Sequence, residues 1–133
     1  GLAAGELPRA AMLKESAEEA GIPLELASKL RPAGVVSYTA FNEDRWGLKR
    51  DVLFSFDLPL PSDFAPTCVD GEMSEFTRTP ISELLGMLEL SEPLFKPNVA
   101  VVLIDFLVRH GFVNPDETGY LELIEQLRGA DCR

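Results

Sequence analysis

The segment ELPRAAMLKESAEEAGI, residues 6–22, carries the most information about the fold of this chain. It predicts a helix from Pro8 to Ala20, because proline suits the first helical turn and Gly21 suits the position just past the end. Pro23 prevents the helix from continuing. Small and apolar residues recur at helical spacing and predict a narrow stripe for packing. The stripe consists of Ala10, Leu13, Ala17 and Ala20.

Three carboxylates of this helix, those of Glu15, Glu18 and Glu19, stand at positions i, i+3 and i+4 and therefore share one face. Their mutual repulsion costs energy, and no basic residue follows at helical spacing to offset it. A hard cation such as Mg²⁺ does offset it, because it prefers carboxylate oxygens. The alternative is an ordinary solvated acidic face. Glu6 precedes the helix and is placed to reach back to Lys14, which would orient the cluster.

The complete spacing resembles the Nudix box, G-x5-E-x7-R-E-U-x-E-E-x-G-U, in which U is a bulky aliphatic residue. The matching positions are Glu6, Glu15, Glu18, Glu19, Gly21 and Ile22. Lys14 stands in place of the usual arginine and keeps the charge without the planar fork. Ser16 stands in place of the first aliphatic residue, and the opening glycine of the box would fall one position before Gly1.

The resemblance implies roles for these residues. Glu15, Glu18 and Glu19 are the expected ligands of Mg²⁺ or Mn²⁺. Catalysis is expected from Glu19 and Lys14 together with a downstream carboxylate, for which Glu72 is the best match. Glu19 and Glu72 are both candidates for taking the proton of the attacking water.

Two other acidic residues, Asp70 and Glu75, are rivals of Glu72 for the downstream position. The alternative for Glu72 itself is a plain turn residue in Asp70-Gly71-Glu72.

The resemblance further implies hydrolysis of a diphosphate linkage in a small organic molecule. Segments 36–38, 56–61, 70–76, 95–98 and 101–111 are similar to the Nudix subgroup related to thiamine pyrophosphokinase. This implies thiamine diphosphate or an analogue as substrate, with nucleoside diphosphate derivatives as the other class. A kinase is disfavoured because the chain has no P-loop. The alternative function is a ligand-binding module of the same fold without catalysis, which the departures at Lys14 and Ser16 motivate.

The remaining pattern predicts an α+β fold. Strands are expected at Val35–Phe41, at Arg50–Leu58, which is apolar enough to be central, and at Glu72–Thr79, with a proline-rich loop over residues 59–71. Further helices are expected at Leu24–Leu30, Ile81–Leu88, Pro97–Arg109 and Asp116–Arg128, the last with Tyr120, Leu121, Ile124 and Leu127 on one face. The resemblance implies an α/β/α sandwich with a mixed sheet. Residues 1–133 would then form the C-terminal portion of one Nudix domain, starting inside the box, with the N-terminal strands missing.

The amino-acid composition limits the kinds of partner and cellular setting that we expect for this chain. The 133 residues include 22 acidic and 12 basic side chains, a net charge of -10, which argues against a nucleic-acid partner. Bound cations would solve the repulsion between such a chain and a phosphate substrate. Cys68 and Cys132 form neither a disulfide framework nor a CxxC pair, which favours a cytoplasmic setting. The apolar stretch Val99–Val108 contains Asp105 and is too short to cross a membrane, so we expect a core helix, or else a homodimer surface.

A cluster of basic and aromatic residues and the single histidine are two further candidates for a functional role, and each also has a purely structural interpretation. Arg45, Trp46 and Arg50 are weak candidates for substrate binding, since together they offer a ring and positive charge, whereas a solvated loop is the simpler interpretation. His110, the single histidine, is expected at a helix C-terminus rather than as a catalytic base.

Overall fold

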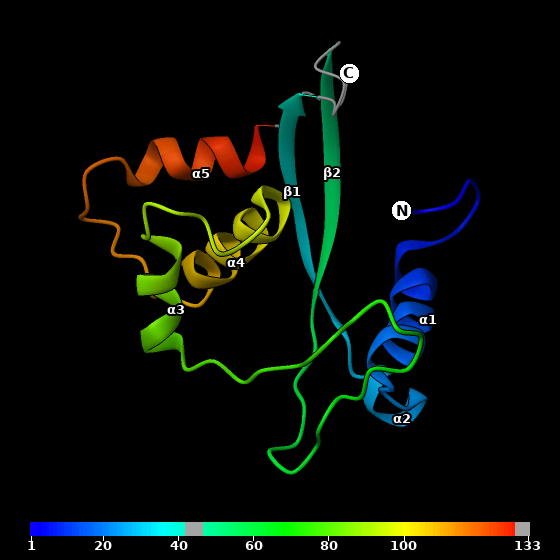
Figure 1. Ribbon diagram of the computed structural model, residues 1–133. Coiled ribbons are helices and arrows are strands. Elements are labelled where there is room, and N and C mark those ends of the chain that lie inside the picture. Colours follow the sequence, from blue (N-terminus) through cyan, green and yellow to red (C-terminus); the bar gives the residue numbers. More distant parts are fainter. Residues whose placement is uncertain (42–46, 130–133) are drawn as a thin grey trace. The chain divides into compact units, whose positions relative to one another are not determined.

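The computed structural model describes residues 1–41 and 47–129, which form five helices and two strands (Figure 1). The elements are α1 (Pro8–Ala20), α2 (Leu24–Ala27), β1 (Arg31–Phe41), β2 (Leu48–Asp57), α3 (Ile81–Leu88), α4 (Pro97–Arg109) and α5 (Tyr120–Arg128). They belong to two compact units. The first comprises Gly1–Ala33 and Phe56–Thr79, and the second comprises Gly34–Ser55 and Pro80–Arg133. The α+β class is confirmed, as are the predicted bounds of α1, α3 and α4.

The first unit is built on α1 and α2. Helix α1 ends as predicted at Gly21, which has a φ of 65° and whose N–H donates to the carbonyl oxygen of Ala17 at 3.1 Å. The Arg9 guanidinium holds the chain that follows α2, donating to the carbonyl oxygens of Leu30 at 2.9 Å and Ser28 at 2.8 Å. The buried apolar residues of this unit are Ile22, Ala27 and Leu30.

The predicted apolar stripe of α1 is wrong at two of its four positions. Ala10 and Ala17 are exposed. The half-buried face runs instead through Met12, Ser16 and Glu19, which follow one another at helical spacing. Small alanines tolerate either environment, so their spacing alone did not identify the packed face.

The second unit contains most of the β1–β2 hairpin, whose two strands form a two-stranded sheet. The alternating burial of β2 places Leu53 and Ser55 inward, whereas Val52 is 40% exposed and Phe54 is 50% exposed. The prediction that this strand is central is therefore wrong for the described residues, in which it has a single neighbour. An apolar run alone does not distinguish a strand with two covered faces from a strand with one.

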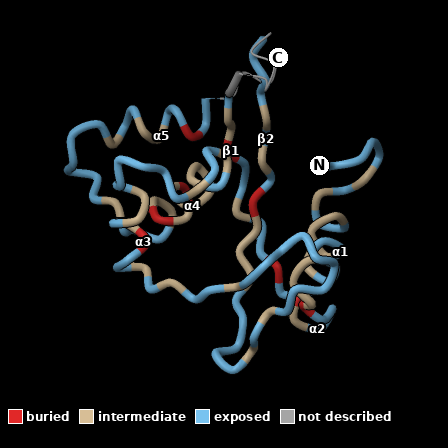
Figure 2. Tube along the Cα trace, in the orientation of Figure 1, coloured by how far each residue is buried: buried red, intermediate tan, exposed pale blue. Residues whose placement is uncertain are grey.

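Helices α3, α4 and α5 complete the second unit, and its buried residues are coloured red along the trace in Figure 2. The apolar ones are Val36, Leu84, Leu107 and Leu127. Asp105 is also buried, and it receives hydrogen bonds from Arg109 at 3.1 Å and from Arg128 at 2.6 Å. Arg128 also donates to the carbonyl oxygen of Val35 at 3.3 Å, so this ionic network joins α4, α5 and β1.

Helix α4 is the apolar stretch that was expected to be core. Leu107 and Asp105 are its buried residues, which supports that expectation. His110 lies at its C-cap, with its ring 4.3 Å from that of Phe106. None of the helices in the described ranges combines the length and apolar character that crossing a membrane requires.

The predicted third strand, Glu72–Thr79, is wrong: these residues have no regular secondary structure. The reason lies at the start of the segment, where Gly71 has a φ of 80° and the Asp70 carboxylate accepts a hydrogen bond from the N–H of Glu72 at 3.0 Å. A side chain that captures a backbone N–H in this way favours a turn over a sheet ladder.

Two helices are shorter than predicted. Helix α2 ends at Ala27, because the N–H groups of Lys29 and Leu30 donate to carbonyl oxygens three residues back and the chain then enters β1. Helix α5 begins at Tyr120, since Gly119 has a φ of 87°. Its predicted inner face is wrong at Leu121, which is 73% exposed, and Leu123 is half-buried instead.

Candidate metal centre

A loop without regular secondary structure, predicted over residues 59–71 and confirmed there, continues to residue 79 and packs against the end of α1. The N–H of Thr67 donates to the carbonyl oxygen of Ala20 at 3.0 Å. This approach depends on Gly21, because a Cβ atom at that position would collide with Thr67 Oγ1 and lie 3.2 Å from Val69 Cγ2. The glycine of the box thus ends the helix and makes room for the loop.

Beyond this contact the loop turns at Asp70-Gly71-Glu72. The turn brings two carboxylates to the half-buried Glu19 of α1. One carboxylate oxygen from each of Glu19, Asp70 and Glu72 lies within 4.8 Å of the other two. We call these three residues the acidic triad.

The electrostatics of the triad are centred on Glu19. Its pKa is raised above the ordinary value of 4.5, first because burial disfavours the charged form. A hydrogen bond with Glu15 and the negative charge of Glu15 raise the pKa further, followed by the charges of Glu72 and Asp70. Glu19 therefore holds its proton more tightly than an isolated glutamate.

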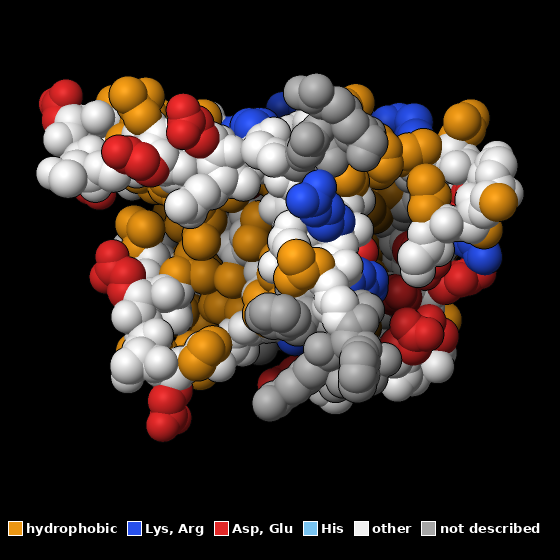
Figure 3. Space-filling model, turned by 90° about the horizontal axis from the view of Figure 1, so that it is seen from above, with side chains coloured by type: hydrophobic (Ala, Val, Ile, Leu, Met, Phe, Trp, Pro, Cys, Tyr) orange, Lys and Arg blue, Asp and Glu red, His pale blue; other side chains and the backbone are white. Residues whose placement is uncertain are grey.

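The triad fits a hard divalent cation. It offers only carboxylate oxygens, which Mg²⁺, Mn²⁺ and Ca²⁺ prefer. Oxygens bound to one octahedral Mg²⁺ at about 2.1 Å lie roughly 3.0 Å apart when adjacent and roughly 4.2 Å apart when opposite. The three triad oxygens lie within 4.8 Å of one another, so a modest closing of the side chains would let them bind one ion. Figure 3 shows several acidic side chains close together at the right of the view, and a cation would reduce repulsion within such a group.

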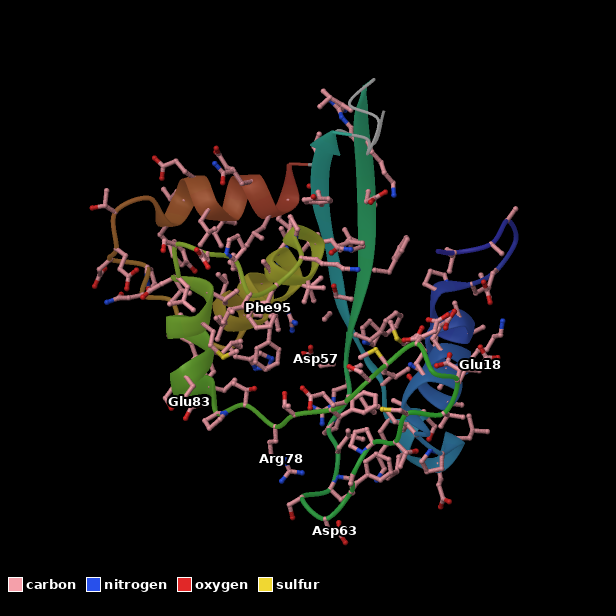
Figure 4. All side chains as sticks on the ribbon, in the orientation of Figure 1. Glu18, Asp57, Asp63, Arg78, Glu83 and Phe95 are labelled. Atoms are coloured by element: carbon pink, nitrogen blue, oxygen red, sulfur yellow. The ribbon has the colours of Figure 1, made fainter. Side chains whose placement is uncertain are left out.

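The other box residues are arranged differently. Glu15 is exposed but interacts with Glu19, one helical turn away. Glu18 and Lys14 are exposed on α1, and Glu18 is labelled in Figure 4. Within residues 1–41 and 47–129, Glu18 belongs to no group of three metal-ligating side chains. The Glu6 carboxylate accepts a hydrogen bond from the N–H of Ala3 at 3.3 Å, rather than the contact with Lys14 that was expected.

The remaining candidates lie away from the triad or outside the described ranges. Glu75 is exposed and is not part of the acidic triad. Arg50 is exposed on β2, in the second unit. Arg45 and Trp46 lie outside the described residues.

The structure adds Asp70, which sequence reasoning had placed only as a rival of Glu72. Both carboxylates stand beside Glu19 because the turn Asp70-Gly71-Glu72 carries them. The Asp-Gly pair is itself a turn signal, but a turn signal does not show that the turn lies beside Glu19.

Comparison with known proteins agrees with this arrangement. The NUDIX domain family matches residues 1–102, a range that contains α1 and the acidic triad. The chain is 42% identical to Nudix hydrolase 20 and 43% identical to Nudix hydrolase 24, two chloroplastic proteins of Arabidopsis thaliana. Each alignment covers 98% of this chain and 36% of the relative.

An uncharacterized protein of Saccharomyces cerevisiae is 35% identical, over 87% of this chain and 36% of its own length. The chain thus spans about a third of the length of the curated relatives that it matches. With the box helix, the downstream carboxylates and the match over residues 1–102 in agreement, this chain belongs to the Nudix family.

Proposed function

We propose that this chain contains the catalytic centre of a Nudix hydrolase that cleaves a diphosphate linkage in a small organic molecule with the help of Mg²⁺ or Mn²⁺. The observation that carries the proposal is the convergence of Glu19, Asp70 and Glu72 from two separate segments. Family membership and the two relatives named Nudix hydrolases support the same activity.

In this proposal the acidic triad holds the cation. Bound there, the ion supplies neutralising charge for the diphosphate and lowers the pKa of the attacking water. Glu15 and Glu18 extend the acidic surface along α1, in the positions that the box implies for further ligands. The net charge of -10 makes such neutralisation necessary for any phosphate substrate.

Glu19 and Glu72 have different roles in this centre. Glu72 is exposed, so the carboxylate oxygen that does not bind the cation can take the proton of the attacking water. Glu19 is half-buried, and its pKa is raised by burial and by the neighbouring carboxylates, so a bound cation would favour its charged form. Lys14 places positive charge on the exposed side of the same helix, where it can contact a phosphate oxygen.

The choice of substrate and the architecture of the whole domain rest on the resemblance to the thiamine pyrophosphokinase-related subgroup. It favours thiamine diphosphate or an analogue as substrate, ahead of nucleoside diphosphate derivatives. It also favours a complete domain with an α/β/α sandwich and a mixed sheet. The names of the plant relatives specify the family and no substrate.

The test is hydrolysis by the full-length protein. Thiamine diphosphate, ADP and ADP-ribose are incubated with Mg²⁺, with Mn²⁺ and with EDTA, and monophosphate release is measured. We expect release with a metal ion and none with EDTA. Tight binding of a diphosphate without release under either metal would overturn catalysis and favour the non-catalytic binding module.

A further inference from the structure

The loop that carries Asp70 and Glu72 also forms a groove that the acidic triad does not use. The groove has a volume of about 570 Å³ and lies entirely within the first unit. One wall comes from residues 60–66 and the other from residues 76–78. The segment between these two walls, residues 67–75, contains both loop carboxylates of the triad.

Arg78 joins the two walls. Its Nη2 donates to the carbonyl oxygen of Ser62 at 3.0 Å, across 16 residues of chain. Figure 4 shows the Arg78 side chain extending toward the loop that carries Asp63. The loop is therefore closed at its neck by Arg78 and fastened to α1 by Thr67, with the triad carboxylates between these two points. The groove and two of the three triad carboxylates therefore belong to the same loop, residues 60–78.

The lining of the groove is mainly apolar. Phe64, Pro66 and Phe76 are half-buried in it, and Leu60 contributes at the edge. Two phenylalanine rings offer flat surfaces on which another ring stacks. Arg78 adds a planar guanidinium with five N–H donors, of which the Ser62 carbonyl uses one. The volume is within the range of about 300–1,000 Å³ that is typical of small-molecule sites.

We propose that this groove binds the organic group of the diphosphate substrate, and that this group is an aromatic or heteroaromatic ring. The ring packs against Phe64 and Phe76, and Arg78 donates to a hydrogen-bond acceptor on its edge. The proposal rests on the proposed function, because the diphosphate is held at the acidic triad. Phe64, Phe76 and Arg78 are then specificity-determining residues.

The test uses the full-length protein and three single variants, Phe64→Leu, Phe76→Leu and Arg78→Lys. The two leucine variants keep an apolar side chain but remove the aromatic ring. Arg78→Lys keeps the positive charge but removes the planar guanidinium. Thiamine diphosphate and ADP serve as aromatic substrates, and isopentenyl diphosphate serves as a substrate without a ring. We expect each variant to lower kcat/KM for the better aromatic substrate roughly threefold to tenfold, mainly through KM, and to lower it less for the ringless substrate, which cannot stack.

Phe95→Leu is the matched control, because Phe95 is a half-buried phenylalanine of the second unit that does not line the groove (Figure 4). It should not change the preference between the two substrate kinds. Mg²⁺ affinity, measured by calorimetry without substrate, should remain at the wild-type value in all variants and shows that the loop is intact.

The outcomes separate this inference from the proposed function. Wild-type hydrolysis with an unchanged substrate preference in Phe64→Leu and Arg78→Lys overturns the groove assignment alone. Absence of hydrolysis in the wild type overturns the proposed function. Binding of thiamine monophosphate in EDTA is then the remaining readout, and its weakening in the three variants would still support the groove.

Discussion

The backbone N–H of Thr67 and the carbonyl oxygen of Ala20 form a hydrogen bond of 3.0 Å between the end of the box helix and the downstream loop. Three residues after Thr67, the loop reaches Asp70, and two residues later Glu72. One backbone contact therefore sets where two of the three triad carboxylates lie relative to Glu19.

The first prediction concerns Gly21→Ala. The new Cβ would collide with Thr67 and would also strain a backbone with a φ of 65°. Left-handed backbone costs a residue with a side chain about 1–2 kcal/mol. Gly111→Ala is the matched control, since Gly111 also follows a helix, has a φ of 76° and has open space around it. Urea unfolding should show a larger loss for Gly21→Ala than for the control, and only Gly21→Ala should weaken Mg²⁺ binding.

The second prediction separates the downstream carboxylates. Asp70→Asn and Glu72→Gln should each weaken Mg²⁺ binding by at least roughly tenfold, because each removes a charged oxygen from the triad. Glu75→Gln should have little effect, since Glu75 lies outside the triad. Titration calorimetry of the three variants measures this directly. Equal losses in all three would show that the loop contributes only general negative charge.

The third prediction concerns turnover. Glu19→Gln should lower kcat by roughly 100-fold or more while leaving the protein folded, because it removes a triad charge in a side chain of the same shape. Glu25→Gln, an exposed glutamate of α2, is the control and should retain wild-type activity. Monophosphate release under saturating substrate and Mg²⁺ is the measurement. A fully active Glu19→Gln enzyme would contradict the assignment of the centre.

The fourth prediction links pH, metal and stability. The pKa of Glu19 is raised in the folded state, so its contribution to stability is fully present below about pH 4.5 and is lost as pH rises through the folded value. Mg²⁺ should restore stability above that value, by about 2.7 kcal/mol when its concentration is 100 times Kd. Thermal unfolding should therefore show a larger rise in Tm with millimolar Mg²⁺ at pH 7.5 than at pH 5.

Variants of the box carboxylates refine this prediction. Glu19→Gln should raise the metal-free Tm at pH 7.5 and reduce the Mg²⁺ effect on Tm. It removes the negative charge that Glu15, Glu72 and Asp70 repel. Glu18→Gln should also raise the metal-free Tm and reduce the Mg²⁺ effect, but by smaller amounts, because Glu18 is exposed and outside the triad. An identical Mg²⁺ effect in wild type and both variants would indicate an ordinary solvated acidic face.

The fifth prediction concerns the second unit. Asp105 is 1% exposed and accepts from two arginines, so Asp105→Asn leaves both with a neutral partner. Removing one partner of a buried ion pair costs about 3–5 kcal/mol, and we expect the lower part of that range because Arg128 is 42% exposed. Asp51→Asn, which breaks a surface pair with Lys49, should cost less than about 1 kcal/mol. Urea unfolding compares the two.

Much of this protein was predictable because the signals are local. Pro8 and Gly21 mark the ends of α1 through their own backbone preferences, which operate whatever surrounds the helix. Pro80 and Pro97 mark the starts of α3 and α4 in the same way. The spacing of the box is also a property of the chain alone, so the sequence by itself determined the family and the group of helix carboxylates to which Glu19 belongs.

Tertiary structure decided which residues meet. Whether Ala10 or Met12 faces inward depends on what packs against α1, and both fit a helical spacing. The loop after Pro59 could not be placed from its own residues, because its position is set by Thr67 bonding to Ala20 across 47 residues of chain. That contact brings Asp70 and Glu72 to Glu19 and leaves Glu75 outside. Contacts between distant segments depend on the packed fold rather than on local pattern, which is why the sequence identified the box and only the structure completed its centre.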